Sequence, residues 1–305
     1  MDTKNPYQSS PPRMLPSFVC YADILGYKSM SKEAINSGNG DVFLQRLHKA
    51  LSEAYERIRK RSEGLSDKTY YTVKVFTDNI VVGYPLDNPD YHYGEPEFGN
   101  IMWAFNELQI ALAMEGFFLR GGIALGDLYM DDDIVFGDGL LQAVEQDTSG
   151  GPPRLSLTPT TIEAVRRQLG FYGAEKTWTP HFEYLLTDAD GTIFVNYLND
   201  AFIGFPDCGV DFKTIGKHRE NIISNLQLFR GKPDIRAKYE WLARYHNFVC
   251  KDFVDRHPAP THEDCDPVYA ESASEAVELL RYIIDIESIA AAPTHIDLEP
   301  IKLQR

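Results

Sequence analysis

The succession of apolar patterns in the first half of the chain most constrains its fold. Residues 16–23 alternate around apolar positions as a strand does, and Ile24-Leu25-Gly26 follows as a turn toward a helix. Residues 41–61 repeat apolar side chains every three or four positions, which predicts an amphipathic helix. Residues 69–76 and 80–84 are rich in Val, Tyr and Thr and predict a hairpin that turns at Thr77-Asp78-Asn79.

A second helix and further strands complete the pattern. Residues 100–115 carry an apolar stripe at helical spacing, and strands are expected over 119–125 and 128–136, separated by a break at Gly126-Asp127. A helix should begin near Asp138. The order strand, helix, strand, strand, helix, strand predicts an α+β fold of the ferredoxin-like βαββαβ kind. Its two helices should cover one face of an antiparallel sheet and leave the other face free.

The 305 residues allow more than this one unit. A helix over 159–169, capped by Thr158, and a strand pair over 182–186 and 192–198 extend the unit to about residue 203. We therefore expect a flexible arm at 1–15, a folded unit over 16–203 and a helical extension over 204–305. The helices expected in the extension cover 217–229, 234–253 and 274–289.

Charge and motifs exclude several function classes. A net charge of -15 disfavours long nucleic acids and anionic membranes as partners, although a divalent cation can reconcile the acidity with a small phosphorylated ligand. The four cysteines form no CxxC pair, and no apolar run is long enough to cross a membrane. The N-terminus lacks the pattern of a secretory signal, so we expect a cytoplasmic protein. The common ATPase, dinucleotide, zinc-protease and serine-hydrolase motifs are missing.

Two aspartates are the main candidates for chemistry. Asp23 ends the first predicted strand and Asp78 stands in the hairpin turn, so both carboxylates can meet at one edge of the sheet. Mg²⁺ and Mn²⁺ take one or two carboxylates together with substrate phosphates, and two such ions can clamp a displacement at phosphorus. The backbone amides of Ile24, Leu25, Gly26 and Tyr27 are candidates to bind a triphosphate at a helix start.

Lys74 is a further candidate because of strand geometry. Side chains two and four positions apart share a face of a strand, and Lys74, Phe76 and Asp78 have this spacing.

Structural explanations remain open for each of these candidate residues. An aspartate in a hairpin often only forms the turn, and a lysine on a strand often only protects an edge. Asp131-Asp132-Asp133 can bind a cation or be a solvated loop.

Four segments together resemble the class III nucleotidyl cyclases, the adenylyl and guanylyl cyclase superfamily. Residues 18–27 (FVCYADILGY) are similar to the family's F-x-D-I-x-G-F opening, and residues 74–78 (KVFTD) to its K-x-x-G-D hairpin. Residues 119–126 (LRGGIALG) are similar to its R-x-G-I-x-x-G strand, and Phe136-Gly137-Asp138 to its W-G-D/N segment. The resemblance covers about residues 16–147, extends loosely to about 200 and leaves the last third of the chain unexplained.

The resemblance implies a site and a reaction. Asp23 and Asp78, with the carbonyl of Ile24, would hold two divalent cations, Mn²⁺ or Mg²⁺, and Lys74 would read the base. The ribose 3'-hydroxyl would attack the α-phosphate and release pyrophosphate, giving a 3',5'-cyclic nucleotide. The family's site lies between two catalytic domains, which implies a homodimer with residues 16–203 as the catalytic domain.

The chain also departs from the family. Ile134 stands where adenylyl cyclases carry a base-reading aspartate, and Leu141 and Glu145 replace the asparagine and the transition-state arginine. Arg120 is the nearest arginine that could serve catalysis. The soluble pyrimidine cyclases of the bacterial Pycsar antiphage system are similar in these losses, in the D-I-L-G opening and in the R-G-G strand.

That likeness implies that UTP is converted to 3',5'-cyclic UMP, which activates a separate effector protein in antiviral defence. Tyr55, Tyr70 and Tyr71 are aromatic residues that could narrow a pocket around a small base. CTP or a purine triphosphate as substrate, a non-catalytic nucleotide sensor and an interaction module carried by the helical third stay open as alternatives.

Overall fold

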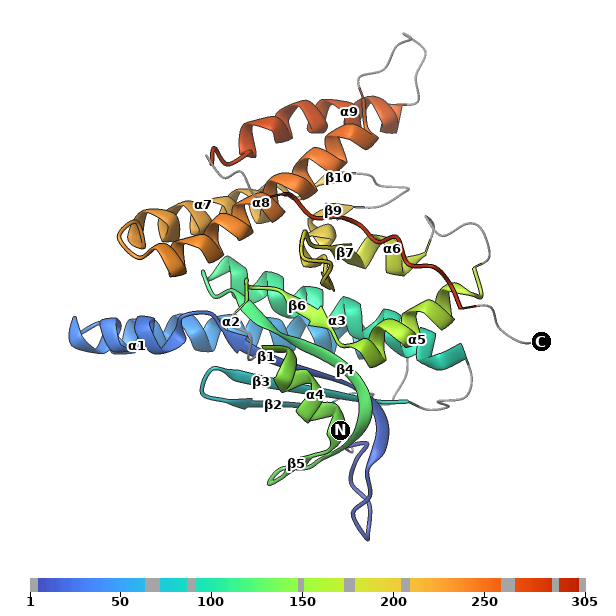
Figure 1. Ribbon diagram of the computed structural model, residues 1–305. Helices are drawn as coiled ribbons and strands as arrows, with labels where there is room; N and C mark the ends of the chain where they lie inside the picture. The colour runs from blue at the N-terminus through green and yellow to red at the C-terminus, as the bar shows by residue number, and fades with distance from the viewer. Residues whose placement is uncertain are drawn as a thin grey trace.

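A mixed β-sheet with helices on both faces forms the centre of the molecule (Figure 1). The computed structural model describes residues 5–63, 72–86, 92–147, 151–172, 179–203, 209–258, 267–286 and 291–301. Within these ranges the sheet has nine strands in the order β11-β7-β8-β6-β4-β1-β3-β2, with β5 paired to β4. They are β1 (Leu15–Ile24), β2 (Thr72–Phe76), β3 (Asn79–Pro85), β4 (Leu119–Met130), β5 (Val135–Phe136), β6 (Leu155–Leu157), β7 (Leu185–Thr187), β8 (Ile193–Val195) and β11 (Thr294–His295).

The helices alternate with these strands in the first half of the chain and dominate the last third. They are α1 (Tyr27–Asn36), α2 (Gly40–Glu63), α3 (Glu95–Met114), α4 (Asp138–Asp147), α5 (Pro159–Leu169), α6 (Pro180–Tyr184), α7 (Phe212–Leu228), α8 (Pro233–Arg256) and α9 (Pro267–Leu279). Short 3₁₀ turns cover η1 (His92–Gly94), η3 (Tyr197–Ala201) and η4 (Leu280–Tyr282), and β9 (Phe202–Ile203) pairs with β10 (Gly209–Val210). The α+β class and the presence of C-terminal helices are as predicted, although α9 begins and ends earlier than the helix predicted over 274–289.

Strand β1 divides the protein into two apolar layers, because successive side chains of a strand point to opposite faces. Phe18, Cys20, Ala22 and Ile24 of β1 join the main core, which includes buried side chains of α2 and α3. Val19 joins a smaller cluster on the other face with Val81 of β3 and Leu128 of β4. Asp23 has the parity of Val19, so its side chain belongs to this second face.

The second face is not free, in contrast to the prediction, because α4 packs on β1 and β4. Glycines allow the helix to come this close: a Cβ at Gly122 would lie 2.5 Å from the carbonyl oxygen of Ala143. Residues of the expected flexible arm also lie here. Tyr7 is 1% exposed and its hydroxyl donates to Ser17 Oγ at 2.9 Å.

The predicted hairpin and the helices over 41–61 and 159–169 are confirmed, but the strand break at Gly126-Asp127 is wrong. β4 runs continuously through this dipeptide, and Gly126 serves the contact with α4, where its Cβ would lie 2.8 Å from Gly139 Cα. The sheet is also not wholly antiparallel. β6 pairs with β4 in parallel, after a connection that contains α4.

The C-terminal helices share the main core with the sheet. Ile222 of α7 and Trp241 of α8 belong to the same cluster of buried side chains as Phe18. Polar contacts cross the expected boundary at 203/204 as well: Asn221 Nδ2 donates to the carbonyl of Ala113 at 2.7 Å, at the end of α3. The division into domains stays a prediction.

Candidate active site

An ion pair joins the ends of two central strands. The β1 register places Asp23 opposite Asn79 of β3 on one side and opposite Arg120 of β4 on the other. The Arg120 guanidinium donates to Asp23 Oδ2 through Nε at 3.0 Å and through Nη2 at 2.8 Å. The side chains are only 13% exposed for Asp23 and 25% for Arg120. The carboxylate is thus held in place and its charge is compensated.

The hairpin turn brings Asp78 to the same sheet edge. Asp78 lies two residues after the end of β2 and directly before β3, and its carbonyl accepts the N–H of Ile24 at 3.1 Å. Thr77 Oγ1 lies 2.7 Å from Asp78 Oδ1 and donates to the carbonyl of Phe76 at 2.6 Å. Thr77 has a φ of +58°, a conformation that favours glycine, and it stands at the glycine position of the K-x-x-G-D pattern. The two aspartates therefore come from segments whose backbones are hydrogen-bonded to each other.

The turn after β1 offers fewer free amides than its sequence suggests. The N–H of Ile24 is bonded to Asp78, and the N–H of Leu25 donates to the carbonyl of Phe118 at 2.8 Å. Gly26, with a φ of +74°, precedes α1, whose first amides have no intrahelical acceptor. The amides left for an anion at this turn are therefore those of Gly26 and Tyr27.

Lys74 shares the sheet face of Asp23, since it lies opposite Val81, which lies opposite Tyr21. Its ammonium is buried and has no hydrogen-bond partner among the described residues, and it lies 5.5 Å from the centre of the Phe76 ring. Asp78 lies in the turn beyond β2, so the strand alternation that relates Lys74 to Phe76 does not extend to it.

Asp131 organises the loop between β4 and β5. Its carboxylate accepts the Tyr129 hydroxyl at 2.6 Å and the N–H groups of Asp133 at 2.9 Å and Ile134 at 2.7 Å. These hydrogen bonds lower the pKa of Asp131, and the positive charge of Lys74 adds to the effect. In the part of the chain that the structure describes, no group of three or more His, Cys, Asp or Glu side chains is arranged to hold a metal. A cation here needs oxygens from a ligand beside the two carboxylates.

A polar cavity of about 320 Å³ adjoins the ion pair and is lined by Arg120, Glu145 and Arg154, among others. Arg154 is 9% exposed and is held by Asp188 and by Asp190, the latter at 2.7 Å. The Trp241 indole of α8 also donates to Asp188, at 2.7 Å. Sequence reasoning missed Arg154, because its partners lie more than thirty residues away and no motif marks them.

Apolar side chains surround this face at the surface. The exposed fractions are 49% for Phe76, 55% for Ile134, 64% for Phe136 and 64% for Leu141. Phe136 therefore does not belong to the packed interior. Tyr239, Trp241, Tyr245 and His246 of α8 are all buried.

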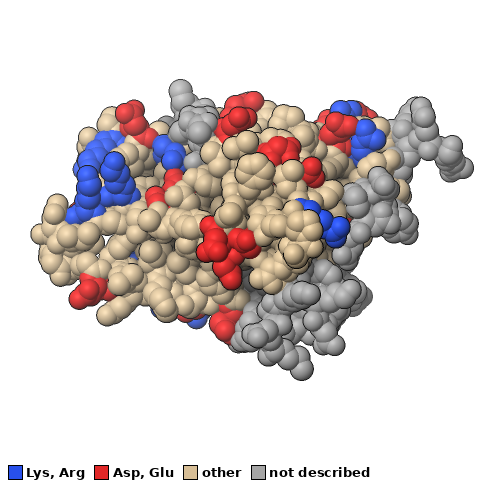
Figure 2. Space-filling view, turned by 90° about the horizontal axis from the view of Figure 1, so that it is seen from below, with Lys and Arg blue, Asp and Glu red and all other residues tan. Residues whose placement is uncertain are grey.

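Of the tyrosines expected to narrow a base pocket, Tyr55 lies on α2, which packs on the opposite sheet face, and Tyr70 and Tyr71 lie outside the described residues. Figure 2 shows the molecule from below, where the acidic and basic side chains of the described residues lie in separate clusters. Across the described ranges, no helix combines the length and apolar character that a membrane crossing requires.

No protein-family profile matches the chain, and a search of curated proteins found no significant relative. The resemblance to nucleotidyl cyclases therefore depends on the four sequence segments alone.

Proposed function

We propose that this protein is a metal-dependent nucleotidyl cyclase that converts a pyrimidine ribonucleoside triphosphate, with UTP favoured, to a 3',5'-cyclic nucleotide and pyrophosphate. The observation that carries the proposal is the ion pair of Asp23 with Arg120 at one sheet edge, beside the hairpin turn that holds Asp78 and the turn that leads into α1. Two carboxylates can bind divalent cations and one guanidinium can bind a phosphate, so this set of side chains fits the charges of a triphosphate bound with divalent cations.

Asp23 and Asp78 are oxygen donors of the kind that Mn²⁺ and Mg²⁺ prefer, so they would hold two such ions together with substrate phosphates and the Ile24 carbonyl. Bound cations would neutralise phosphate charge and make the ribose hydroxyl more acidic. The 3'-oxygen bonds to the α-phosphorus, the bond to the bridging oxygen of the β-phosphate breaks, and the hydroxyl proton passes to water. Arg120, which is paired with Asp23, could instead pair with a phosphate oxygen of a substrate bound to the Asp23 carboxylate through a cation.

Hydrogen-bonding capacity supports UTP over CTP. Lys74 carries only donors, which suit the two carbonyl oxygens of uracil. The Asp131 carboxylate, whose pKa is lowered in part by the charge of Lys74, already accepts three hydrogen bonds and leaves little capacity for the amino group of cytosine or adenine. The buried Lys74 ammonium must turn toward the open face for this contact.

A second copy of the chain would complete the site. Phe76, Ile134, Phe136 and Leu141 are large apolar side chains exposed on elements around the Asp23 face, and burying them against a partner would be favourable. The proposal thus includes a homodimer in the cytoplasm, without nucleic acid or membrane partners. It also includes a separate effector protein that responds to the cyclic nucleotide in antiphage defence.

The test is to incubate the full chain with Mn²⁺ and each of the four ribonucleoside triphosphates and to identify cyclic products by mass spectrometry. Cyclic UMP is expected as the main product. Asp23→Asn and Asp78→Asn should each lower its formation at least a hundredfold while circular dichroism stays unchanged. Asp255→Asn, which alters an exposed aspartate of α8, serves as the matched control. Equal turnover in all four proteins would refute the assignment.

A nucleotide sensor without turnover is the second candidate. It is favoured by the exposed Leu141 and by Glu145, which replace the polar and cationic side chains that the resemblance leads one to expect on α4. Binding of UTP with Mn²⁺ and no release of pyrophosphate would select it over the cyclase.

A further inference from the structure

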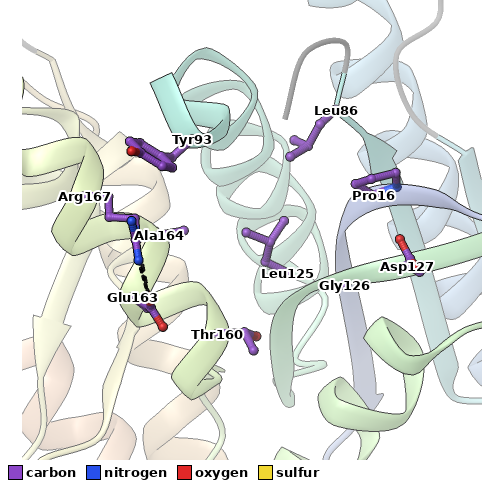
Figure 3. A pocket seen from close by; sticks show the side chains of 10 residues that line it. All are labelled: Pro16, Leu86, Tyr93, Leu125, Gly126, Asp127, Thr160, Glu163, Ala164 and Arg167. Carbon is purple, nitrogen blue, oxygen red and sulfur yellow. Dashed lines mark hydrogen bonds and ion pairs between the residues drawn. The ribbon is translucent and has the colours of Figure 1, made fainter. Parts of the chain in front are cut away.

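A second pocket lies on the sheet face opposite Asp23. It measures about 350 Å³ and opens between α5, the turn η1, the start of β1, the end of β3 and the middle of β4 (Figure 3). Tyr93 and Arg167 stand on one side, Leu86 and Pro16 face them, and Leu125 lies at the back. An engineered cavity of about 150 Å³ already binds benzene, so this pocket has room for one substituted ring.

Of the charged side chains around the pocket, one carboxylate has no partner of opposite charge among the described residues. Arg167 Nη2 pairs with Glu163 Oε1 at 2.6 Å, and its guanidinium lies 5.2 Å from the centre of the Tyr93 ring. Asp127 uses its N–H to bind Asp138 Oδ1 at 2.9 Å. No hydrogen bond or ion pair holds its carboxylate within the described ranges. The wall therefore combines apolar and aromatic surface with one unmatched negative charge.

Tyr93 is fixed in an uncommon conformation. Its φ is +55°, which costs roughly 1–2 kcal/mol for a residue with a side chain. Its carbonyl accepts from Gln168 Nε2 at 2.8 Å, and the buried Gln168 is hydrogen-bonded in turn to His181 at 2.7 Å. Surrounding contacts thus hold the aromatic ring at the pocket in spite of the strain.

Three wall residues contact α4, the helix on the Asp23 face. Gly126 lies between the pocket and the helix and packs closely on α4, because a Cβ at this position would lie only 2.8 Å from Gly139 Cα. Asp127 is bonded to Asp138, and Thr160 Oγ1 donates to Gln142 Oε1 at 2.9 Å. Gln142 Nε2 completes the chain by donating to Asp138 Oδ2 at 2.9 Å.

The other end of α4 reaches the candidate active site. Glu145, two turns after Asp138, lines the polar cavity together with Arg120. Because α4 is a single short helix, a displacement of its first turn also moves Glu145 relative to the Asp23–Arg120 pair.

We propose that this pocket is an effector site for a compact aromatic molecule that carries one positive charge, and that its occupancy acts on α4. Apolar surface and Tyr93 would contact the ring, and Asp127 would pair with the cation. The binding step depends on the pocket alone, whereas any effect on turnover rests on the proposed function.

Three single-ring probes of similar size test the binding step: benzamidine, benzyl alcohol and benzoate, titrated into the full chain and followed by saturation-transfer NMR. Benzamidine should bind about two- to fivefold more tightly than benzyl alcohol, and benzoate most weakly. Asp127→Asn should remove the difference between the first two, while Asp234→Asn, at an exposed site on α8, should keep it. Benzoate binding as tightly as benzamidine would overturn the proposal.

Variants with a larger side chain in the pocket test whether benzamidine binds there. Ala164→Leu should weaken benzamidine at least fivefold, and Pro16→Phe, at an exposed position, gives the same test should the first variant fold poorly. Unchanged affinity in the folded variants would place the probe elsewhere and overturn the site.

Hydrogen exchange tests the coupling. Saturating benzamidine should change protection in residues 138–147, and Gln142→Ala should keep affinity within twofold but lose this change. An unchanged α4 at saturation would refute the coupling. If binding and the α4 response occur in a protein that makes no cyclic nucleotide, the proposed function fails and the site stands. If the protein is active and saturating benzamidine leaves its rate unaltered, the regulatory role fails.

Discussion

Asp23 has two competing uses at the scale of single residues, as the partner of Arg120 and as a ligand for a cation. Because the Arg120 guanidinium contacts Asp23 Oδ2 through Nε and Nη2, a divalent ion that uses this oxygen must displace or share the guanidinium. Arg120→Ala should therefore tighten the binding of Mn²⁺ without nucleotide, by about tenfold if roughly 1.4 kcal/mol of competition is removed. Isothermal titration with Mn²⁺ measures this.

Asp23→Asn is the paired test and should abolish the heat of Mn²⁺ binding, whereas Lys28→Ala, which changes an exposed residue of α1, should have no effect. Equal affinity in the native protein and in Arg120→Ala would mean that the cation does not use the paired carboxylate.

Residues of this site differ in how far sequence alone could predict them. Asp23 and Asp78 were predictable because a strand end and a hairpin turn are local patterns. The pairing of Asp23 with Arg120, 97 positions away, was not, because it depends on the β1–β4 register. The engaged Ile24 and Leu25 amides likewise follow from contacts with Asp78 and Phe118, which no local pattern encodes.

At the scale of elements, β4 and α4 show where sequence patterns mislead. Gly126-Asp127 has the composition of a turn, yet the glycine there serves close packing in a continuous strand. The sequence predicts a helix that begins near Asp138, but not the face of the sheet that this helix covers. The tertiary contact with Gly122 and Gly126 decides that.

Gly122→Ala should test this contact. The added Cβ would lie 2.5 Å from the Ala143 carbonyl oxygen and 2.6 Å from Gln146 Cβ, so α4 must shift. We expect the free energy of unfolding in urea to fall by about 1–3 kcal/mol. Gly99→Ala on α3 is the control, because its Cβ has no neighbour within 4 Å and alanine favours a helix. A similar small effect of both changes would show that α4 is not tightly packed there.

Helices α7 and α8 meet at two buried histidines, whose Nδ1 atoms lie 3.0 Å apart. His246 Nε2 must donate to the Tyr282 carbonyl, so its Nδ1 accepts from His218 and both rings are neutral. Burial lowers the pKa of His246 to about 4 and that of His218 well below its usual value. In the unfolded chain both titrate near 6.5, so that state binds more protons below this pH.

The free energy of unfolding should therefore fall as pH drops from about 6.5 toward 4, and urea titrations across that range measure the fall. His246→Gln removes one titrating group and should flatten the dependence. His48→Gln, an exposed position on α2, should leave the slope as it is. A slope that His246→Gln does not change would show that these rings stay solvated.

Over the whole molecule, the last third of the chain supports the sheet that carries the candidate site. Phe118, which precedes β4 and accepts the Leu25 N–H, packs edge-on against His218 and Tyr239, with ring centres 5.7 and 6.0 Å apart. Trp241 reaches Asp188 and, through it, Arg154 at the polar cavity. The C-terminal helices thus touch both the turn after β1 and the wall beside Arg120.

A chain cut after residue 203 should therefore not fold stably, because it exposes one side of α3 and leaves the backbone N–H of Leu198 without the Tyr245 hydroxyl. We expect no cooperative thermal transition and strong binding of a hydrophobic dye. A cut after residue 290 removes β11 and the Arg166 contact with Glu299 but keeps the shared core, so a cooperative transition at lower temperature is expected. Cooperative unfolding of residues 1–203 would instead mean that the sheet has a sufficient core of its own. The helical third would then be free to act as a separate module, and the path from Trp241 to Arg154 would have no part in holding the site.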